Sequence, residues 1–499
     1  MRKVKTKYDL NVLLRIVNVF VCGVCIYLYN ICEDNTLVNI ITLILVCIFA
    51  VENIGMLVYE KRKRNPFVII LVIVMTVFYM LRIATILHMP ASVSIFGFSF
   101  IPSVIALNDT MIFILLSNAA MFAGFYFSEK YCEIQKKKIG EADGFPQIKN
   151  AVIIIALAVL ICFCDVLSFS PLGRLNGFIQ TFLNRNTIML FTFTMLSYHY
   201  DGISPRNRIL FAAAIIAMVI LTTLSGSRSG ILTVSVAMLM GILAVKKRIV
   251  FNKKIVFAGL LIVPLSIVLF TAATLKQNLG IKDKLSTQYL FEDSGSNSFN
   301  FELVNRYLPQ LYYRLGFLDY STELIANRQK FAQIINGQYY AESIVDNVLT
   351  PGFDVFGTQR TSNSMRFIRN EEPIPGREQI EKFYHTDQMG IYGDYYVFFN
   401  GYPALIVFLF SGFLFQFVFN TLKSENALKT CIYRAVLINI FYIWLNSFGM
   451  DWFIFDLIVA IITTFLFARY YVSNRRRKIV FRIEPRKKPI GTHSVAQEI

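Results

Sequence analysis

Two long apolar runs of the chain meet at the sequence Leu221-Thr222-Thr223-Leu224-Ser225-Gly226-Ser227-Arg228-Ser229-Gly230. The first run begins near Arg208, so about 20 helical residues at roughly 1.5 Å each would place Arg228 about 30 Å away, which is the thickness of a membrane's hydrocarbon core. Small neighbouring residues leave room for an anionic ligand to approach the guanidinium closely. The sequence therefore predicts two membrane helices joined by a cation-bearing turn, with Arg228 at the centre of a functional site.

The composition is that of an integral membrane protein. Of the 499 residues, 55% are hydrophobic and 16% are charged, whereas soluble domains have about 25% charged residues. The apolar residues fall into runs of about 20, which is typical of spanning helices and excludes a barrel of alternating strands. The net charge of +17 comes mainly from short clusters between these runs, so it indicates membrane topology and not a nucleic-acid partner. The predicted fold class is an all-α integral membrane protein.

Basic clusters identify the ends of apolar runs that face the cytoplasm, because Lys and Arg are enriched in cytoplasmic loops. Such clusters stand at residues 2–7, 61–64, 136–138, 206–208, 246–248 and 475–478. About twelve transmembrane helices, with the N and C termini both cytoplasmic, place every cluster on one side. In this topology Arg228 lies at the outer end of its helix pair.

One polar segment late in the chain is too long for a simple connection between helices. It has 12 basic residues from Lys276 to Lys382 and 14 acidic residues from Asp283 to Asp387, so its charges nearly cancel. Because cytoplasmic loops carry an excess of Lys and Arg, this balance predicts a position on the external side of the membrane. The predicted organisation is transmembrane helices 1–9 in residues 1–275, one large external loop domain between helices 9 and 10 in 276–394, helices 10–12 in 395–472 and a basic cytoplasmic tail in 473–499.

Three arginines lie within apolar runs or at their outer ends, where a charge is costly and indicates a functional position. Counting residues from the nearest cytoplasmic end places Arg82, Arg185 and Arg228 at similar heights in the outer half of the membrane. Arginine binds phosphate oxygens through a planar fork and keeps its charge, so these residues predict a site for a lipid-linked pyrophosphate. The alternative is that they reach the nearby interface or pair with an acidic residue such as Asp165.

The first part of the external domain is rich in aromatic residues. Apolar side chains spaced three to four residues apart over 301–349 predict a helix that lies across the mouth of the bundle. We expect Tyr312 and Tyr313 to stack on sugar rings of a substrate. The alternative is that these aromatic groups only pack on the membrane domain.

Ionisable side chains concentrate in the second part of the external domain, residues 351–394. His385 and Asp394 are predicted to assist a hydroxyl group as acid–base residues, because His titrates near neutral pH and Asp394 stands where the chain re-enters the membrane. Arg360 and Arg377 are expected to add to the pyrophosphate site. The sequence has no nucleotide-binding glycine motif and no metal-binding triplet, so neither a cofactor nor a metal is expected.

The helix count, the large external loop and two short patterns resemble the O-antigen polymerase and O-antigen ligase-like membrane proteins. One pattern, similar to the family's Ser-x-Ser-Arg-x-Gly turn, is Ser225-Gly226-Ser227-Arg228-Ser229-Gly230. The other, similar to an acidic residue followed by an aromatic-Gly pair, is Gly393-Asp394-Tyr395-Tyr396-Val397-Phe398-Phe399-Asn400-Gly401-Tyr402-Pro403-Ala404. Ligases of the family tend to carry a His-Asn pair at the end of the loop, whereas Thr386 and Asp387 follow His385 here, which favours a polymerase.

The resemblance implies an enzyme, a membrane glycosyltransferase that works by inverting glycosyl transfer with the arginines stabilising the leaving pyrophosphate. We expect it to polymerise undecaprenyl-pyrophosphate-linked oligosaccharide repeat units into a surface polysaccharide such as a capsule, at the outer face of a bacterial cytoplasmic membrane. Membrane lipid and a chain-length regulator protein are further expected partners. The alternatives are an O-antigen-type glycan ligase and a lipid-linked oligosaccharide flippase, which is not an enzyme.

Overall fold

The structure of the chain is a computed structural model. The residues that it describes are 20–21, 23–24, 35–63, 65–80, 82–83, 103–134, 145–146, 148–166, 185–198, 203–224, 230–245, 317–350, 355–374, 389–422, 424, 426–447 and 449–473. The predicted first span is therefore described at only a few positions, and the predicted ninth span, near 255–275, lies outside the described residues.

The described part of the chain is mostly helical, which confirms the predicted all-α class. Its helices are α2 (Asn35–Lys63), α3 (Pro66–Val74), η1 (Met75–Met80), α5 (Val104–Ile134), α6 (Ile148–Val166), α8 (Arg185–Tyr198), α9 (Pro205–Leu224), α10 (Gly230–Ala244), α13 (Phe317–Ala326), α14 (Arg328–Ile334), α15 (Gly337–Ile344), η5 (Val345–Leu349), α16 (Thr361–Asn370), α18 (Ile391–Phe398), α19 (Ala404–Thr421), α20 (Ala427–Leu445) and α21 (Met450–Tyr471). Two short strands accompany them, β1 (Phe145–Pro146) and β2 (Val472–Ser473).

Four of the described helices are long and apolar enough to cross a membrane. They are Val104–Cys132 within α5, Ala404–Thr421 (α19), Ala427–Leu445 (α20) and Met450–Tyr471 (α21). Shorter apolar helices occupy Asn39–Asn53, Pro66–Met80 and Ile148–Leu160. These helices indicate a membrane protein. The expected total of about twelve spans and the direction in which they cross the membrane remain predictions.

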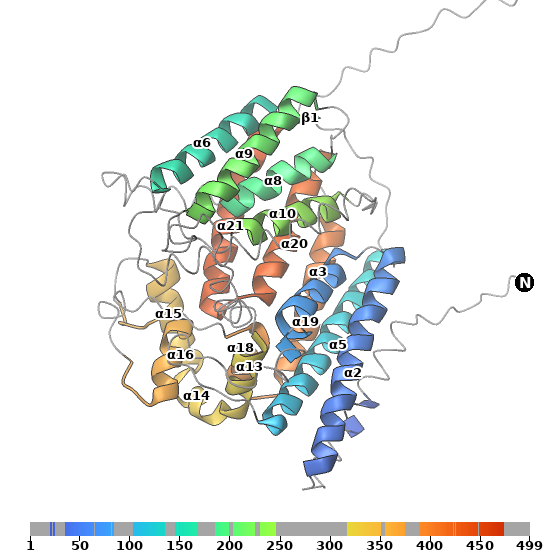
Figure 1. The fold of residues 1–499 in the computed structure, drawn as a ribbon, viewed down its shortest axis with the longest axis vertical. Helices are drawn as coiled ribbons and strands as arrows, with labels where there is room; N and C mark the ends of the chain where they lie inside the picture. The colour runs from blue at the N-terminus through green and yellow to red at the C-terminus, as the bar shows by residue number, and fades with distance from the viewer. Residues whose placement is uncertain are drawn as a thin grey trace, which may run out of the picture.

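Helices α5 and α19 lie side by side with their backbones in close contact (Figure 1). A Cβ atom at Gly124 of α5 would overlap the backbone of Leu409 in α19. One at Gly412 of α19 would likewise overlap the backbone of Met121 in α5. Small residues permit such an approach between apolar helices, whose association in a membrane depends on close packing. The two glycines therefore determine where these helices cross.

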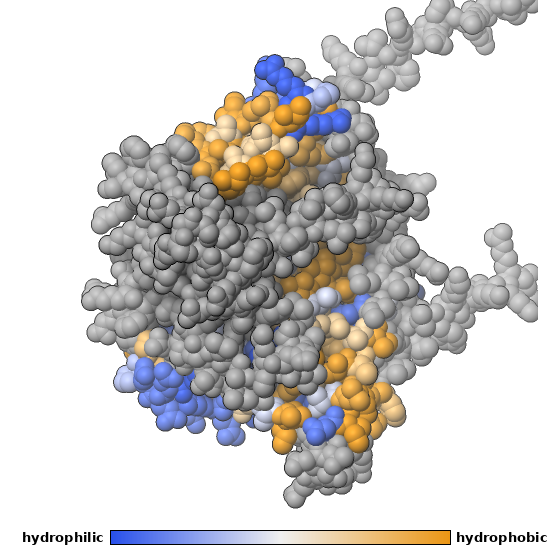
Figure 2. Space-filling model, viewed as in Figure 1, coloured by the Kyte–Doolittle hydropathy of each residue, from blue (hydrophilic) through white to orange (hydrophobic). Residues whose placement is uncertain are grey.

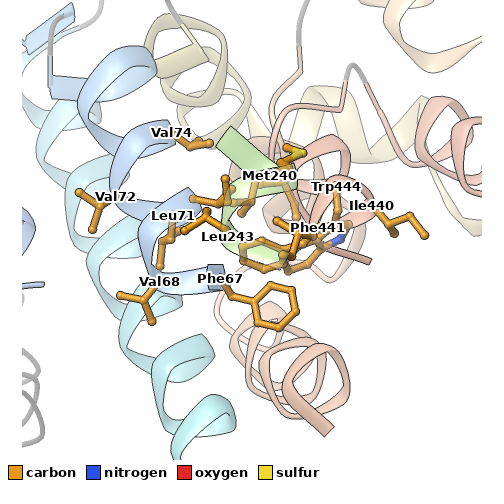
Figure 3. Close-up of a cluster of buried hydrophobic side chains, with 14 of the residues drawn as sticks. Phe67, Val68, Leu71, Val72, Val74, Met240, Leu243, Ile440, Phe441 and Trp444 are labelled. Atoms are coloured by element: carbon orange, nitrogen blue, oxygen red, sulfur yellow. The ribbon is translucent and has the colours of Figure 1, made fainter. Parts of the chain in front are cut away.

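A buried apolar cluster joins α3, α10 and α20 (Figure 3). Phe67 of α3 stands edge-on to Phe441 of α20, with 5.0 Å between the ring centroids, and Met240 and Leu243 of α10 are buried in the same cluster. The start of α3 is fixed by Asn65, whose side chain accepts a hydrogen bond from the backbone N–H of Phe67. Three distant parts of the sequence therefore share one core.

A two-stranded antiparallel pair joins the start of α6 to the end of α21. Phe145 pairs with Ser473, and Pro146 pairs with Val472. Because β1 precedes α6 and β2 follows α21, these ends of the two helices lie together. The sequence predicts a cytoplasmic position for both segments, and their pairing is compatible with that prediction.

The helices of the predicted external domain gather at the end of the bundle drawn at the bottom of Figure 1. Helix α13 packs against α5, η1 and α18, whereas α15 and η5 pack against α21. On the face shown in Figure 2, hydrophilic residues gather over α14 and α16, and apolar residues gather over α6, α9 and α2. These helices, α13, α14, α15, η5 and α16, therefore form a capping layer at one end of an apolar bundle.

The single helix expected over 301–349 is wrong for the part that is described. From Phe317 onward the chain forms α13, α14, α15 and η5, with breaks at Asn327 and Asn336. Asn336 caps α15, because its side chain accepts a hydrogen bond from the backbone N–H of Tyr339. A capping side chain of this kind favours a new helix start over continuation of the preceding helix.

The apolar run expected to cross the membrane from Tyr395 onward is also divided. It begins as α18, ends at Phe399 and resumes as α19 at Ala404. The turn between them contains Asn400 with φ +57° and Gly401 with φ +104°, which an α-helix cannot contain. The spanning helix therefore starts nine residues later than the predicted boundary, and α18 belongs to the capping layer.

Candidate functional site

Helix α18 brings Asp394 to the contact between the capping layer and the bundle. The helix begins after Gly390, whose φ of +65° glycine adopts at little cost. Gly393 lets α18 approach α13 closely, since a Cβ atom there would lie 2.9 Å from Cα of Ser321. Asp394 itself is 1% exposed. Its carboxyl group therefore lies inside the protein, where three helices meet.

Asp394 joins α18 to α15 and α21. The hydroxyl of Tyr340 in α15 donates to Oδ1, and the backbone N–H of Met450, the first residue of α21, donates to Oδ2 at 2.9 Å. Burial raises the pKa of Asp394 to about 7, opposed by the hydrogen bond from Tyr340 and reinforced by the charge of Asp451. Burial also raises the pKa of Tyr340 well above its usual 10. The Asp394 carboxyl group is therefore suited to gain or lose a proton near neutral pH.

Asp451, in the first turn of α21, connects two helices of the capping layer to the bundle. Its carboxylate accepts hydrogen bonds from the hydroxyl of Ser343 in α15 at 2.7 Å and from both the N–H and the hydroxyl of Thr361 in α16 at 3.0 Å. The backbone N–H of Trp452 adds a fourth donor at 2.8 Å. A buried carboxylate with four donors is stabilised without a cation.

Arg360, one of the predicted phosphate ligands, precedes α16 and stacks on α21. Its guanidinium carbon lies 3.6 Å from the ring centroid of Trp452 and 5.4 Å from that of Phe455. One of its amino groups donates to the backbone carbonyl of Asn347 at 3.4 Å, and it interacts electrostatically with Asp456. The aromatic stack therefore holds a permanent cation beside the first turns of α21.

Arg82, a predicted pyrophosphate ligand, forms a buried ion pair with Asp319 of α13. Nε of Arg82 lies 2.6 Å from Oδ2 of Asp319, and the two side chains are 4% and 2% exposed. Burial raises the pKa of Asp319, although the charge of Arg82 opposes this. The pairing alternative considered for Arg82 therefore holds in this structure, with Asp319 as its partner in place of Asp165.

A second arginine pair holds α13 one helical turn further along the chain. Arg369 of α16 donates to both carboxylate oxygens of Glu323, at 2.5 Å and 2.9 Å. Glu323 is 3% exposed, whereas Arg369 is 16% exposed. Such a two-point contact fixes the orientation of both side chains. Helix α13 is therefore held by Arg82 of the bundle and, one turn away, by Arg369 of the capping layer.

The sequence reasoning missed Asp319, Glu323 and Tyr340. Asp319 and Glu323 are four residues apart, so they lie one turn apart on α13. The neighbouring Phe317 and Leu324 are apolar and buried. Two acidic residues at this spacing within an apolar helix were a signal for buried pairing.

Several predicted site residues lie outside the described residues. They are Arg228, Arg377, His385, Tyr312 and Tyr313. Arg185 is the first residue of α8, and its side chain is not described. The structure does bring the remaining three, Arg82, Arg360 and Asp394, to the layer where α13, α16 and α18 cap the bundle.

Within the described ranges, no group of three or more His, Cys, Asp or Glu residues is arranged to hold a metal ion. Comparison with models of protein families, with curated proteins and with solved structures finds no match for the chain. Function is therefore inferred from the residues of the site and from their arrangement at one end of a membrane bundle.

Proposed function

We propose that the protein is a membrane glycosyltransferase that polymerises undecaprenyl-pyrophosphate-linked oligosaccharide repeat units. The reaction takes place at the outer face of a bacterial cytoplasmic membrane and yields a surface polysaccharide. The acceptor hydroxyl attacks the anomeric carbon of the donor sugar with inversion. One C–O bond to the acceptor forms, the C–O bond to pyrophosphate breaks, the hydroxyl proton passes to a base, and undecaprenyl pyrophosphate leaves.

One observation carries this proposal: charged groups from distant parts of the chain are joined at one end of the bundle. Arg82 pairs with Asp319 on α13, and α13 packs on the helix of Asp394. Asp394 accepts a hydrogen bond from the backbone N–H of Met450, at the start of α21. The next residue, Asp451, accepts a hydrogen bond from the backbone N–H of Thr361, which follows Arg360 in the sequence. A glycosyl transfer with an anionic leaving group needs such a rigid polar layer where a membrane helix bundle meets the aqueous side.

In this proposal the arginines stabilise the leaving group. Negative charge on the pyrophosphate grows as the anomeric bond breaks, so cations already in place lower the barrier without reorganising. Arg228 has the central role, and Arg185 and Arg377 complete the pyrophosphate site. Arg360 is a permanent cation at the rim of the same layer. Arg82 acts indirectly, because its pairing with Asp319 holds α13 in place.

An acid–base side chain of the external domain accepts the proton of the acceptor hydroxyl. The pKa of Asp394, raised to about 7, suits a general base at neutral pH. In the described arrangement, however, Asp394 is 1% exposed and its oxygens accept from Tyr340 and Met450. The role of base therefore falls first to His385, whereas Asp394 holds α15 and α21 together.

The test is the glycan phenotype of a deletion strain, followed by polymerisation of purified lipid-linked repeat units by the full-length protein. A strain that attaches single repeat units to its acceptor, together with polymer formation in vitro, supports the polymerase. Complete repeat chains that never reach the acceptor would indicate a ligase. Repeat units that accumulate on the cytoplasmic side would indicate a flippase, and either result overturns the proposal.

A further inference from the structure

Three large apolar side chains of the capping layer are exposed although they lie outside the four spanning helices identified in the described part of the chain. Leu349 at the end of η5 is 62% exposed, and Val355 and Phe356 are each 56% exposed. We propose that these three residues, the apolar tip, form an interfacial anchor that inserts into the membrane leaflet at which α21 begins. The anchor holds the capping layer against the lipid surface whatever substrate the site takes.

The backbone of the apolar tip is fixed by a buried carboxylate. Asp346 in η5 is fully buried and accepts from the backbone N–H groups of Val355 at 3.0 Å, Phe356 at 3.1 Å and Thr358 at 2.8 Å. Nδ2 of Asn347 also donates to the carbonyl of Thr358 at 3.1 Å. Hydrogen bonds to an ionised carboxylate are stronger than neutral ones. The chain is therefore held in a conformation that keeps Val355 and Phe356 pointing away from the core.

The position of the tip along α21 corresponds to the membrane surface. Trp452 lies in the first turn of this spanning helix, and tryptophan is enriched at membrane–water interfaces. Arg360 stacks on the Trp452 ring at 3.6 Å. Phe356 precedes Arg360 by four residues, so its Cα lies within about 14 Å of that of Arg360. Helix α15 and η5, which carry the other side of the tip, also pack against α21.

Lipid is the occupant that this position favours. Further along α21, Ile461 is 55% exposed and Phe465 is 85% exposed, so this helix presents an apolar face of the kind that lipid covers in a bilayer. The tip adds apolar side chains near the start of the same helix. Arg360 adds a cation at the level where headgroup phosphates lie. Apolar side chains beside a cation at a helix end are the combination found in interfacial anchors.

The test introduces a photo-crosslinking residue into the full-length protein at the tip, as Phe356→p-benzoylphenylalanine. The protein is reconstituted into liposomes that contain a fluorescent phosphatidylglycerol, and illumination should yield a lipid adduct. The matched control is Gln333→p-benzoylphenylalanine, at an exposed position of α14. We expect several-fold more adduct at position 356 than at position 333.

A second variant tests the role of the buried carboxylate. Combining Asp346→Asn with the crosslinker at position 356 weakens three backbone contacts and should lower the lipid adduct, while the variant still purifies as a monodisperse protein. Equal adducts at positions 356 and 333 would overturn the anchor. Crosslinking of position 356 to another protein in native membranes, without a lipid adduct, would also overturn it and identify a protein-binding surface instead.

Discussion

The carboxylate of Asp319 lies 2.6 Å from Nε of Arg82, although 237 residues separate them in the sequence. Arg82 follows the π-helix η1 of the bundle, and Asp319 belongs to α13 of the capping layer. Removing one partner of a buried ion pair costs more than the pair contributes, because the other charge remains buried without compensation. The contact therefore makes the position of α13 depend on Arg82.

Breaking this pair should destabilise the protein strongly. We expect Asp319→Ala to cost about 3–5 kcal/mol, because it removes the carboxylate that lies 2.6 Å from the buried Arg82 guanidinium. Thermal unfolding of the purified protein in detergent measures the loss, and Arg82→Met in the same chain should recover most of it. Lys330→Ala is the control, since the Lys330–Glu371 pair is exposed and such pairs contribute about 0–1 kcal/mol. An Asp319→Ala protein as stable as the control would contradict the role of the pair.

The stability of the protein should fall as the pH rises from about 4 to about 7. The folded state raises the pKa of Asp394 from 3.8 to about 7, so in this window it binds a proton that the unfolded chain has lost. Stability decreases with pH wherever the folded state holds more protons. Asp394→Asn should remove this part of the pH dependence, as measured by Tm between pH 4 and pH 8. Glu372→Gln, at an exposed carboxylate, should leave it unchanged, and an Asp394→Asn profile identical to wild type would disprove the assignment.

The proposed role of Arg228 predicts a graded loss of activity. Arg228→Lys keeps the charge but loses the planar fork, so polymerisation should fall on the order of 10²-fold, which is the cost of one preorganised donor. Arg228→Ala should be nearly inactive while the protein still inserts into the membrane. The assay is polymerisation of purified lipid-linked repeat units, with Arg206→Lys at the exposed start of α9 as the control. Wild-type rates from a folded Arg228→Ala protein would remove Arg228 from the site.

Side chains larger than hydrogen should not be tolerated where α5 and α19 cross. Gly412→Ala places a methyl group against the backbone of Met121, which cannot move without displacing the whole helix. Overpacking of a core typically costs about 1–3 kcal/mol, and backbone overlap should reach the upper end of that range. The yield of monodisperse protein and its Tm in detergent measure the effect. Gly337→Ala, where the added methyl group meets nothing within 4 Å, should behave as wild type.

Hydrophobic runs predicted the long helices because a lipid-facing helix must be apolar along its whole length. The run predicted to end near Val472 corresponds to α21, which ends at Tyr471. The same signal could not locate the turn at Asn400 and Gly401, because apolar residues flank it on both sides. A backbone with positive φ interrupts a helix without lowering its hydropathy. Continuous hydropathy therefore predicted one helix where the structure has two.

The site was only partly predictable, for a related reason. Hydropathy singled out Arg82 as a charged residue within an apolar run, and counting residues along the helix predicted its height in the membrane. Its partner depends on how the external segment folds back, which the sequence spacing does not encode. Asp319 therefore looked like one acidic residue among many in a polar segment. Asp394 was identified from its position at the end of that segment, but its contact with Met450 needed the tertiary structure.

The four hydrogen bonds to Asp451 have a consequence for motion. Ser343 and Thr361 belong to different helices of the capping layer, yet both bind the same carboxylate at the first turn of α21. Neither α15 nor the start of α16 can lift away from α21 without breaking contacts at this point. Movement of either helix therefore costs hydrogen bonds to Asp451, so one carboxylate couples the local stability of α15 to that of α16.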